Sequence, residues 1–436
     1  MDSNRPQATA LMKLKGWRER SINDVARIVG GGTPSTKVKI FWNGGIPWIT
    51  PKDLSEQKDK YIERGNRNIS NDGMNNSNAK IIPSDSVILS TRAPIGYIAI
   101  SKRNLTTNQG CHSLVPFGDV STEFLYYLLL ANVEFLKSQS NGSTFGELPA
   151  RVIKELHFLF PPLKEQQVIA KVLSDLDSKI ELNREMNKTH ESIAQAIFKH
   201  WFIDFEFPNE EGEPYKSSRR EMVDSELGKI PEGWRVCKLA NYVNVIKGCS
   251  YRSEDLKESN IALVTLKSFN RGGGFNQNGY KEYIGNYERD QILNEGDIII
   301  AQTDLTQKAE VIGRTAIVNS LGKYSRLIAS LDLQIVRPKE SLPLNYIYYL
   351  LNRDAFHNHA LSYANGTTVL HLNKNAVLEY TIVIPPKDIL ERFDLCTTAS
   401  IKKISANIRE NDGLENIRDL LLPKLMTGKI KVPLES

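Results

Sequence analysis

Short polar stretches that follow predicted strands hold the side chains best suited to recognition chemistry in this chain. Residues 90–96 read Ser-Thr-Arg-Ala-Pro-Ile-Gly after a buried-strand pattern, which places two hydroxyls and a guanidinium at a turn. Residues 302–308, Gln-Thr-Asp-Leu-Thr-Gln-Lys, follow a second such strand. Such groups pair with phosphates and base edges, Arg favouring guanine and Asn or Gln favouring adenine. The pattern favours nucleic-acid binding, and solvated turn chemistry is the alternative for any single residue.

The candidate nucleic-acid contacts are basic, hydroxyl and amide side chains in such stretches, in both halves of the chain. They are Lys37, Thr50, Lys52, Ser90, Thr91, Arg92, Thr107, Asn108, Gln109, Ser143, Thr144, Lys267, Gln302, Thr303, Thr306, Lys308, Asn365, Thr367 and Thr368. Because each half contributes a set, we expect two separate DNA-binding surfaces.

A catalytic constellation is hard to find in this sequence. Residues 30–37, Gly-Gly-Gly-Thr-Pro-Ser-Thr-Lys, lack the Gly-Lys-Ser/Thr ending of a phosphate loop. The Asn/Asp-Pro-Pro-Tyr/Phe motif of amino-group methyltransferases is absent, since residues 160–163 and 384–387 read Phe-Pro-Pro-Leu and Ile-Pro-Pro-Lys. His357 and His359 are two residues apart, so they would point in different directions on a helix. We therefore expect no catalytic site, no metal site and no cofactor in this chain.

The sequence is an internal repeat. Gly-Trp-Arg at residues 16–18 recurs at residues 233–235, each time opening a region of mixed strands and loops. Further matches in the same order join 46–52 with 261–267, 82–89 with 293–300, 124–129 with 346–351 and 141–144 with 365–368. This order predicts a duplicated unit of a globular domain followed by a helix.

Two long segments have the apolar spacing of paired helices. Residues 164–202 contain neither Pro nor Gly, and their apolar residues recur at steps of three and four. A lone helix cannot bury such a seam, and residues 388–426 supply a matching one. We expect an antiparallel coiled coil with a kink or frayed turn at Gly413. Two unrelated amphipathic helices, each packed on its own domain, are the alternative.

Aligning the Pro-Pro pairs before the two segments gives an offset of 224 residues. At that offset, Asn183 and Asn187 fall on Asn407 and Asn411, so both seams turn polar in the middle. Polar seam positions usually fix the register of a coiled coil at some cost in stability.

Charge and composition are those of a globular protein that meets a polyanion. The net charge is +5, and it is distributed as +6 over residues 1–160, +4 over residues 235–387 and −5 over the remaining residues. Basic domains with acidic spacers suit DNA. The four cysteines form no CxxC pair, and no window resembles a membrane span or a signal peptide, so we expect a cytoplasmic protein.

At this point the chain resembles the specificity subunit of type I restriction–modification systems over essentially its whole length. The residues that carry the resemblance are the repeated Gly-Trp opening, Ser-Thr-Arg-Ala-Pro-Ile-Gly at 90–96, Thr-Asn-Gln-Gly at 107–110, Phe-Pro-Pro-Leu-Lys-Glu-Gln at 160–166 and Leu-Leu-Leu-Pro-Lys-Leu-Met-Thr-Gly-Lys-Ile at 420–430. The second half departs from the family pattern, because residues 385–390 lack the Glu-Gln pair after the prolines.

The resemblance implies an α+β fold in which two target recognition domains are separated by two long antiparallel helices, with pseudo-twofold symmetry. The expected parts are recognition domain 1 (residues 1–160), a first spacer helix (161–203), a linker (204–232), recognition domain 2 (233–387) and a second spacer helix (388–430). Each domain would read one half of a bipartite double-stranded DNA target.

The resemblance also implies that the chain is not itself catalytic. It would assemble with two modification subunits that carry S-adenosylmethionine and methylate adenine N6. Two restriction subunits that use ATP and Mg would also join, and no membrane is involved. The alternatives are a stand-alone DNA methyltransferase or nuclease with an unrecognised site, and a tandem-domain scaffold that does not bind DNA.

Overall fold

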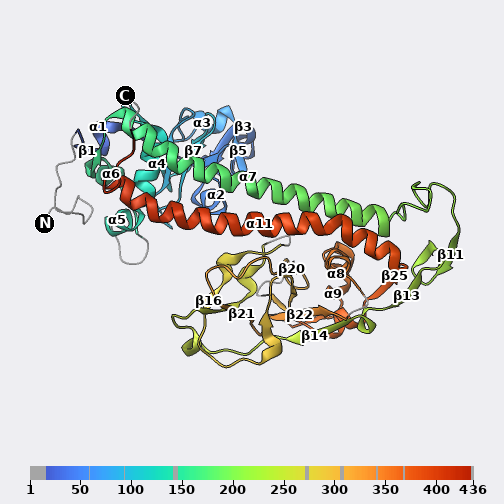
Figure 1. Ribbon diagram of the computed structural model, residues 1–436. Helices are drawn as coiled ribbons and strands as arrows, with labels where there is room; N and C mark the ends of the chain where they lie inside the picture. The colour runs from blue at the N-terminus through green and yellow to red at the C-terminus, as the bar shows by residue number, and fades with distance from the viewer. Residues whose placement is uncertain are drawn as a thin grey trace. The chain divides into compact units, whose positions relative to one another are not determined.

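The computed structural model describes residues 16–57, 59–92, 94–140, 146–270, 274–304, 309–339, 342–366 and 369–433 (Figure 1). The chain divides into two compact units, one formed by residues 1–181 and 413–436 and the other by residues 182–412. Two long helices, α7 (Leu163–Phe202) and α11 (Lys387–Met426), contribute a segment to each unit. Each unit therefore combines a globular domain with part of both helices.

The globular domain of the first unit contains two main sheets. One has the strand order β2-β9-β6-β7-β4, with strands at Ala26–Gly30, Cys111–Pro116, Val87–Ser90, Ile98–Ser101 and Tyr61–Ile62. The other has the order β5-β3-β8, with strands at Arg67–Ile69, Trp42–Ile49 and Thr106–Thr107. The pairs β3–β8 and β4–β7 are parallel and the other pairs are antiparallel. β1 (Arg18–Ser21) pairs with β10 (His157–Phe160), directly before α7.

Short helices connect and cover these sheets. They are α1 (Ile22–Val25), α2 (Pro51–Glu56), α3 (Asn71–Asn75), α4 (Thr122–Ala131), α5 (Val133–Ser138) and α6 (Ala150–Glu155), with a 3₁₀ turn η1 at Lys39–Phe41. Ser or Thr hydroxyls cap the N-termini of α1 to α4, at Ser21, Thr50, Ser70 and Ser121. Helix α4 is buried along residues 124–129 and packs on β6 and β7, so it forms the centre of the domain core.

The second unit contains the corresponding sheets. Their orders are β14-β22-β18-β20 (Val243–Lys247, Leu333–Pro338, Ile298–Ala301, Thr315–Ile317) and β16-β15-β21-β17 (Lys281–Glu282, Ile261–Val264, Arg326–Ala329, Ile292–Leu293). A small sheet has the order β19-β24-β23 (Thr303–Asp304, Leu370–Leu372, Ala364–Asn365). β13 (Arg235–Lys238) pairs with β25 (Thr381–Ile384), directly before α11. The segment predicted as a plain linker contains a hairpin of β11 (Met222–Ser225) and β12 (Gly228–Pro231).

The helices of the second domain are α8 (Leu344–Leu351), α9 (Asp354–Leu361) and α10 (Asn375–Leu378). Its 3₁₀ turns are η2 (Leu239–Asn241), η3 (Ser253–Asp255), η4 (Leu266–Ser268), η5 (Gln277–Gly279) and η6 (Arg289–Gln291). Helix α8 is apolar and buried like α4, and it begins at the residues that the sequence repeat aligns with α4.

The strand pairings confirm the internal repeat. The pair β1–β10 corresponds to β13–β25, and the antiparallel set β2-β9-β6 corresponds to β14-β22-β18. The parallel pair β3–β8 corresponds to β15–β21, with Ile49 opposite Thr107 in one domain and Val264 opposite Ala329 in the other. The predicted fold class, two α+β domains with two long antiparallel helices, is therefore confirmed.

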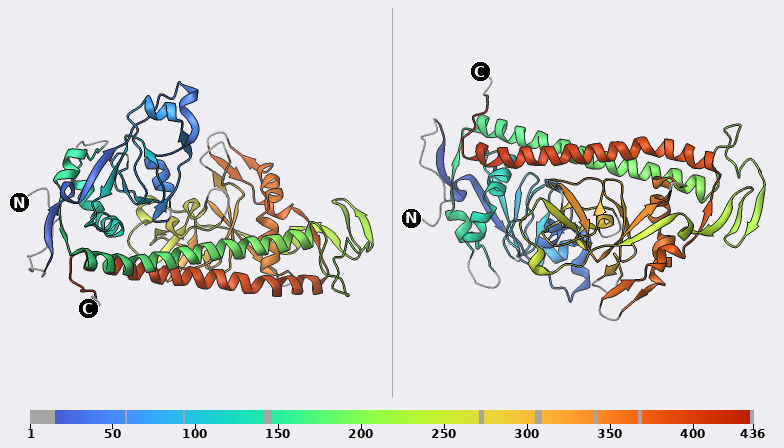
Figure 2. Two further views of the ribbon diagram at one scale, coloured as in Figure 1. Left: turned by 90° about the horizontal axis from the view of Figure 1, so that it is seen from above. Right: turned by 60° about the horizontal axis from the view of Figure 1, so that its bottom comes forward.

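The two long helices pack antiparallel in each unit (Figures 1 and 2). In the second unit, Asn183 contacts Asn411 and Asn187 contacts Asn407. Residue numbers thus increase along α7 while those of their partners on α11 decrease, as in an antiparallel pair. The predicted alignment of four asparagines in the seam is therefore confirmed. Helix α11 is continuous from Lys387 to Met426, so the frayed turn expected at Gly413 is not formed, and no neighbouring atom crowds this glycine. A kink at Gly413 stays a prediction.

Candidate nucleic-acid interface

The loop between β8 and β9 is the point where the strand ends of the first domain meet. Asn108 N donates to Ile49 O at the end of β3 over 2.8 Å, and Gly32 N, after β2, donates to Thr107 O over 2.9 Å. Thr91 N, after β6, donates to Gly110 O over 2.8 Å. Segments 31–37, 50–52, 91–92 and 108–110 therefore emerge side by side. We call them the first loop cluster.

The Gly-rich start of the first loop cluster serves close packing of backbone. A Cβ on Gly31 would lie 2.0 Å from Asn108 O, and one on Gly32 would lie 2.3 Å from Ala79 N. The indole of Trp48 donates to Gly32 O over 2.9 Å and holds the loop in place. The glycines at these positions are thus required because the neighbouring backbone leaves no space for a side chain.

Several predicted contacts lie exposed on the first loop cluster. The side chains of Lys37, Lys52, Arg92 and Gln109 face solvent. Lys52 Nζ forms a loose ion pair with Glu56 at 3.8 Å, and the Gln109 amide accepts from the hydroxyl of Thr33. These groups provide two ammonium charges, a guanidinium and an amide on one edge of the domain, which suits phosphate and base contacts.

Arg92 is held by an acidic neighbour. Its Nη2 donates to Glu147 Oε1 over 2.5 Å, and both side chains remain nearly half exposed. Beneath this pair, His112 Nδ1 lies 2.9 Å from Thr91 Oγ1. Burial lowers the pKa of His112, so the ring favours its neutral form and leaves Arg92 as the cation at this position.

Other predicted contacts of the first domain are used inside it. Ser90, Thr91 and Thr107 are buried: the Ser90 hydroxyl donates to Pro94 O over 2.9 Å, and that of Thr91 meets His112. Thr50 caps α2, donating to Asp53 Oδ2 over 2.5 Å and accepting from Asp53 N. Asn108 Oδ1, half-buried, accepts from Gly110 N over 2.9 Å. Ser90, Thr91 and Thr107 are thus enclosed by the domain, because turn and strand-end chemistry uses the same hydroxyls as recognition. Their contact with DNA stays a prediction.

The second domain repeats this arrangement around residues 330–332. Ser330 N donates to Val264 O over 3.0 Å, and Gln302 N donates to Asp332 O over 2.7 Å. Cys249 N, after β14, donates to Ala329 O over 2.8 Å. Segments 248–252, 265–268, 302–304 and 330–332 therefore emerge together as a second loop cluster.

The predicted contacts of the second domain also divide into exposed and buried residues. Lys267 and Asn365 are exposed, and Gln302 is half-buried with its Oε1 unpartnered among the described residues. Thr303 is buried and donates to Asp332 Oδ1 over 3.0 Å, and its contact with DNA stays a prediction. The predicted contacts Ser143, Thr144, Thr306, Lys308, Thr367 and Thr368 lie outside the described residues.

The sequence did not reveal the middle of the second loop cluster. Residues 329–332, Ala-Ser-Leu-Asp, take the place of Thr-Asn-Gln-Gly at 107–110 without sharing one residue type. Asp332 was missed for this reason, and the parallel strand pairing identifies it. Thr33 was missed as well, and its hydrogen bond to Gln109 places it in the first loop cluster. Asp332 adds a half-buried carboxylate, which can accept from the amino group of a base.

Within the described part of the chain, no cluster of three or more His, Cys, Asp or Glu side chains could hold a metal ion. Cys111, Cys237, Cys249 and Cys396 are free thiols. No helix formed by the described residues is long and apolar enough to cross a membrane.

Comparison with known proteins identifies the family. The profile described as "Type I restriction modification DNA specificity domain" matches residues 14–191 and 231–410, one match for each repeat. The chain is 36% identical over 430 residues to the type I restriction enzyme MjaIX specificity subunit of Methanocaldococcus jannaschii, covering 96% of this chain and 94% of that one. It is 22% identical to the HindI specificity subunit of Haemophilus influenzae, over 96% of this chain and the whole of the relative.

A solved structure has the same fold. The type I restriction–modification S subunit from M. genitalium matches with a TM-score of 0.54 and 16% identity, over 97% of this chain and 98% of that one. The family profile matches once in each repeat, and the 36% identity to a specificity subunit extends over nearly the whole chain. Both findings agree with the repeated domains and loop clusters. The chain therefore belongs to the type I restriction–modification DNA specificity family, whose members are non-catalytic specificity subunits.

Proposed function

We propose that this chain is the DNA-sequence-recognition subunit of a type I restriction–modification complex, and that each globular domain reads one half of a bipartite target. The observation that carries the proposal is the repetition of one loop cluster, at the same strand ends, in two domains that each match the family. Duplicated surfaces of this kind suit two half-sites on one duplex.

The exposed side chains of the loop clusters support contacts of two kinds. Lys37 and Lys52 in the first cluster and Lys267 in the second supply charges for phosphates. Arg92 and Gln109 supply the fork and the amide that recognise guanine and adenine edges. Phosphate contacts would place each domain on the duplex, and these side chains would discriminate between bases.

The long helices would set the gap between the half-sites. Each has 40 residues, which extend over about 60 Å at about 1.5 Å per residue. A half-site repeat of one helical turn of DNA is about 34–36 Å, within the reach of such helices. Two weak readers joined in this way would bind one duplex far more tightly than either domain alone, because the second contact is intramolecular.

The helices would also dock two modification subunits. Ile193 on α7 and Ile417 on α11 occupy equivalent positions of the repeat, and they are exposed to similar extents, 47% and 48%. Two matching apolar sites fit two copies of one partner. In this proposal the modification subunits bring S-adenosylmethionine for adenine N6 methylation. Two restriction subunits bring ATP and Mg, the complex acts in the cytoplasm, and this chain binds no cofactor.

Co-expression with the modification subunit, followed by sequencing of N6-methyladenine in the host DNA, tests the proposal. The expected result is one bipartite motif with a fixed gap. Methylation by this chain alone would instead reveal an enzyme. A stable complex with no methylation, and with binding insensitive to salt, would indicate a scaffold that does not act on DNA.

A further inference from the structure

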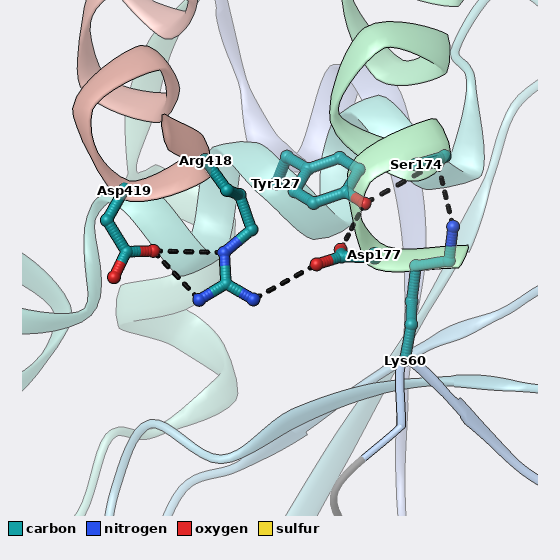
Figure 3. Close-up of polar contacts among 6 residues, drawn as sticks. All are labelled: Lys60, Tyr127, Ser174, Asp177, Arg418 and Asp419. Atoms are coloured by element: carbon teal, nitrogen blue, oxygen red, sulfur yellow. Dashed lines mark hydrogen bonds and ion pairs between the residues drawn. The ribbon is translucent and has the colours of Figure 1, made fainter. Parts of the chain in front are cut away.

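A buried polar network joins the first globular domain to both long helices (Figure 3). The hydroxyl of Tyr127, on α4, donates to Asp177 Oδ2 on α7 over 2.5 Å. Arg418 Nη1, on α11, donates to the other carboxylate oxygen of Asp177 over 3.0 Å. The side chains of Asp177 and Arg418 are only 17% and 25% exposed. One carboxylate therefore holds a domain helix and the second long helix at the same time.

The edge of the domain sheet joins the same network. Lys60, directly before β4, donates to Ser174 Oγ on α7 over 2.7 Å, and its ammonium lies 5.7 Å from the centre of the Tyr127 ring. Burial lowers the pKa of Lys60, and the charge of Asp177 opposes this shift more strongly than those of Glu123, Glu181 and Asp175. Asp419 accepts from Arg418 Nε and Nη2 over 2.9 and 2.8 Å, which fixes the plane of the guanidinium.

Hydrogen-bonded ion pairs of this kind restrict the orientation of the domain on its helix segments more than apolar packing does. Asp419 holds the guanidinium of Arg418 at two nitrogens, so the third, Nη1, points at Asp177 in a fixed direction. The hydrogen bond between Arg418 and Asp177 is charge-assisted and strengthens where water is excluded. Burial of apolar surface, by contrast, has no preferred direction. Because a rocking motion would leave a buried charge without its partner, the network favours a single orientation of the first domain on its helix segments.

The second unit has neither the carboxylate nor the guanidinium of this network at the equivalent positions. The repeat offset of 224 residues places Ile401 where Asp177 stands and Ala194 where Arg418 stands. There, Tyr349 on α8, which the repeat aligns with Tyr127, donates to Glu191 on α7 over 3.4 Å. The ring of Phe198 on α7 lies 6.2 Å from Tyr349 and 5.8 Å from Phe393 on α11. Among the described residues, the carboxylate–guanidinium anchor between a domain and both helices thus belongs to the first unit.

Resting on the proposed function, we infer that Asp177 is a positioning residue for half-site spacing. By holding Tyr127 and Arg418, it fixes the first recognition domain at one angle on the helices. One more base pair in the gap moves a half-site by about 3.4 Å and rotates it by roughly 34° around the duplex. A domain held at one angle rejects that displaced site, whereas a domain free to rock accepts it.

Replacing Asp177 with Asn tests the inference, because the amide keeps the shape of the carboxylate and removes its charge. The variant is co-expressed with the modification subunit and a plasmid library in which the gap of the established motif is one or two base pairs shorter or longer. N6-methyladenine sequencing then gives methylation at each gap. We expect methylation at neighbouring gaps, relative to the native gap, to rise about tenfold, with methylation at the native gap retained.

Tyr127→Phe and Arg418→Gln should shift the gap profile in the same direction, and Tyr127→Phe keeps the core ring if Asp177→Asn does not fold. Asp175→Asn is the matched control on the same helix, because Asp175 is exposed and forms its ion pair with Lys171, one turn away. Its profile should equal that of the native chain.

An unchanged gap profile in the folded variants would overturn the inference. So would an equal loss of methylation at every gap, because it would show a role in stability alone. Absence of a bipartite motif with the native chain would instead refute the proposed function, so the two failures can be told apart.

Discussion

Asn183 Nδ2 on α7 donates to Asn411 Oδ1 on α11 over 2.9 Å, and both residues are buried. Asn183 and Asn407 are equivalent in the repeat, and Asn407 makes the matching contact with Asn187 over 2.8 Å. Each of these two donors leaves its own Oδ1 unpartnered among the described residues. A polar layer with unused acceptors costs stability, which indicates that it is retained to fix the register of the helices.

Replacing Asn183 alone with Leu should lower the free energy of unfolding by about 1–3 kcal/mol, because it removes the donor to Asn411 and Glu410 in a buried place. Replacing Asn183 and Asn411 together with Leu should recover stability to the native level or above it. Urea unfolding followed by circular dichroism measures both. A double variant less stable than the single one would contradict the view that this pair serves register.

Glu191 gives the second unit a stability that depends on pH. Burial raises the pKa of Glu191, and its carboxylate accepts from the hydroxyls of Tyr348 and Tyr349 over 3.4 Å each. The folded state therefore keeps its proton to higher pH than the unfolded state. This contribution to stability is present below the ordinary Glu pKa and is lost as the pH rises through the raised one.

Glu191→Gln, which mimics the protonated acid, should raise the thermal midpoint at pH 7.5 and leave it unchanged at pH 4. Glu185→Gln, on the exposed side of the same helix, is the control and should change neither value. Thermal unfolding at the two pH values decides the matter, and a lower midpoint for Glu191→Gln at pH 7.5 would show that the charged form is the stabilising one.

Arg92→Ala should weaken specific DNA binding by about 1–3 kcal/mol and relax one position of one half-site. Glu147→Gln should strengthen DNA binding, because it releases Arg92 from its ion pair without removing the guanidinium. Fluorescence anisotropy of the complex with the native target, at several salt concentrations, measures both. Unchanged affinity and an unchanged methylation motif in Arg92→Ala would place Arg92 outside the interface.

Duplicating residues 182–188 and 406–412 together should lengthen the preferred gap by about 3 base pairs. These seven-residue segments face each other in the antiparallel register, since Asn183 meets Asn411 and Asn187 meets Asn407. Seven residues add about 10.5 Å to each helix, close to three steps of B-DNA. Methylation of the gap library reports the preferred gap, and an unmoved optimum would refute the view that the helices measure it.

The sequence was sufficient for the features that rest on local pattern. Helical spacing and the offset of 224 residues predicted both long helices and the asparagine layer, because a period of apolar residues is a property of neighbouring positions. The sequence repeat predicted two domains, because the matched segments recur in the same order along the chain. The expected frayed turn at Gly413 is not formed, because one glycine in a long helix costs only about 1 kcal/mol.

The site depended on contacts that no local pattern encodes. Thr91 and Thr303 have the residue type of a recognition contact, yet tertiary contacts bury them. Asp332 was missed because its loop shares no residue with the equivalent loop of the first domain. The network of Tyr127, Asp177 and Arg418 joins residues 50 and 241 positions apart, and only the fold brings them together.

Chimeric proteins test most directly whether each domain reads its own half-site. Residues 17–160 are replaced by the aligned segment of the Methanocaldococcus jannaschii relative, and N6-methyladenine is sequenced after co-expression with the native modification subunit. A reciprocal chimera replaces residues 233–387. If each domain reads its own half-site, each exchange should alter one half of the bipartite motif and leave the gap unchanged. The two chimeras should alter different halves. A motif that survives either exchange in full, or that changes in both halves at once, would contradict the claim that each domain reads its own half-site.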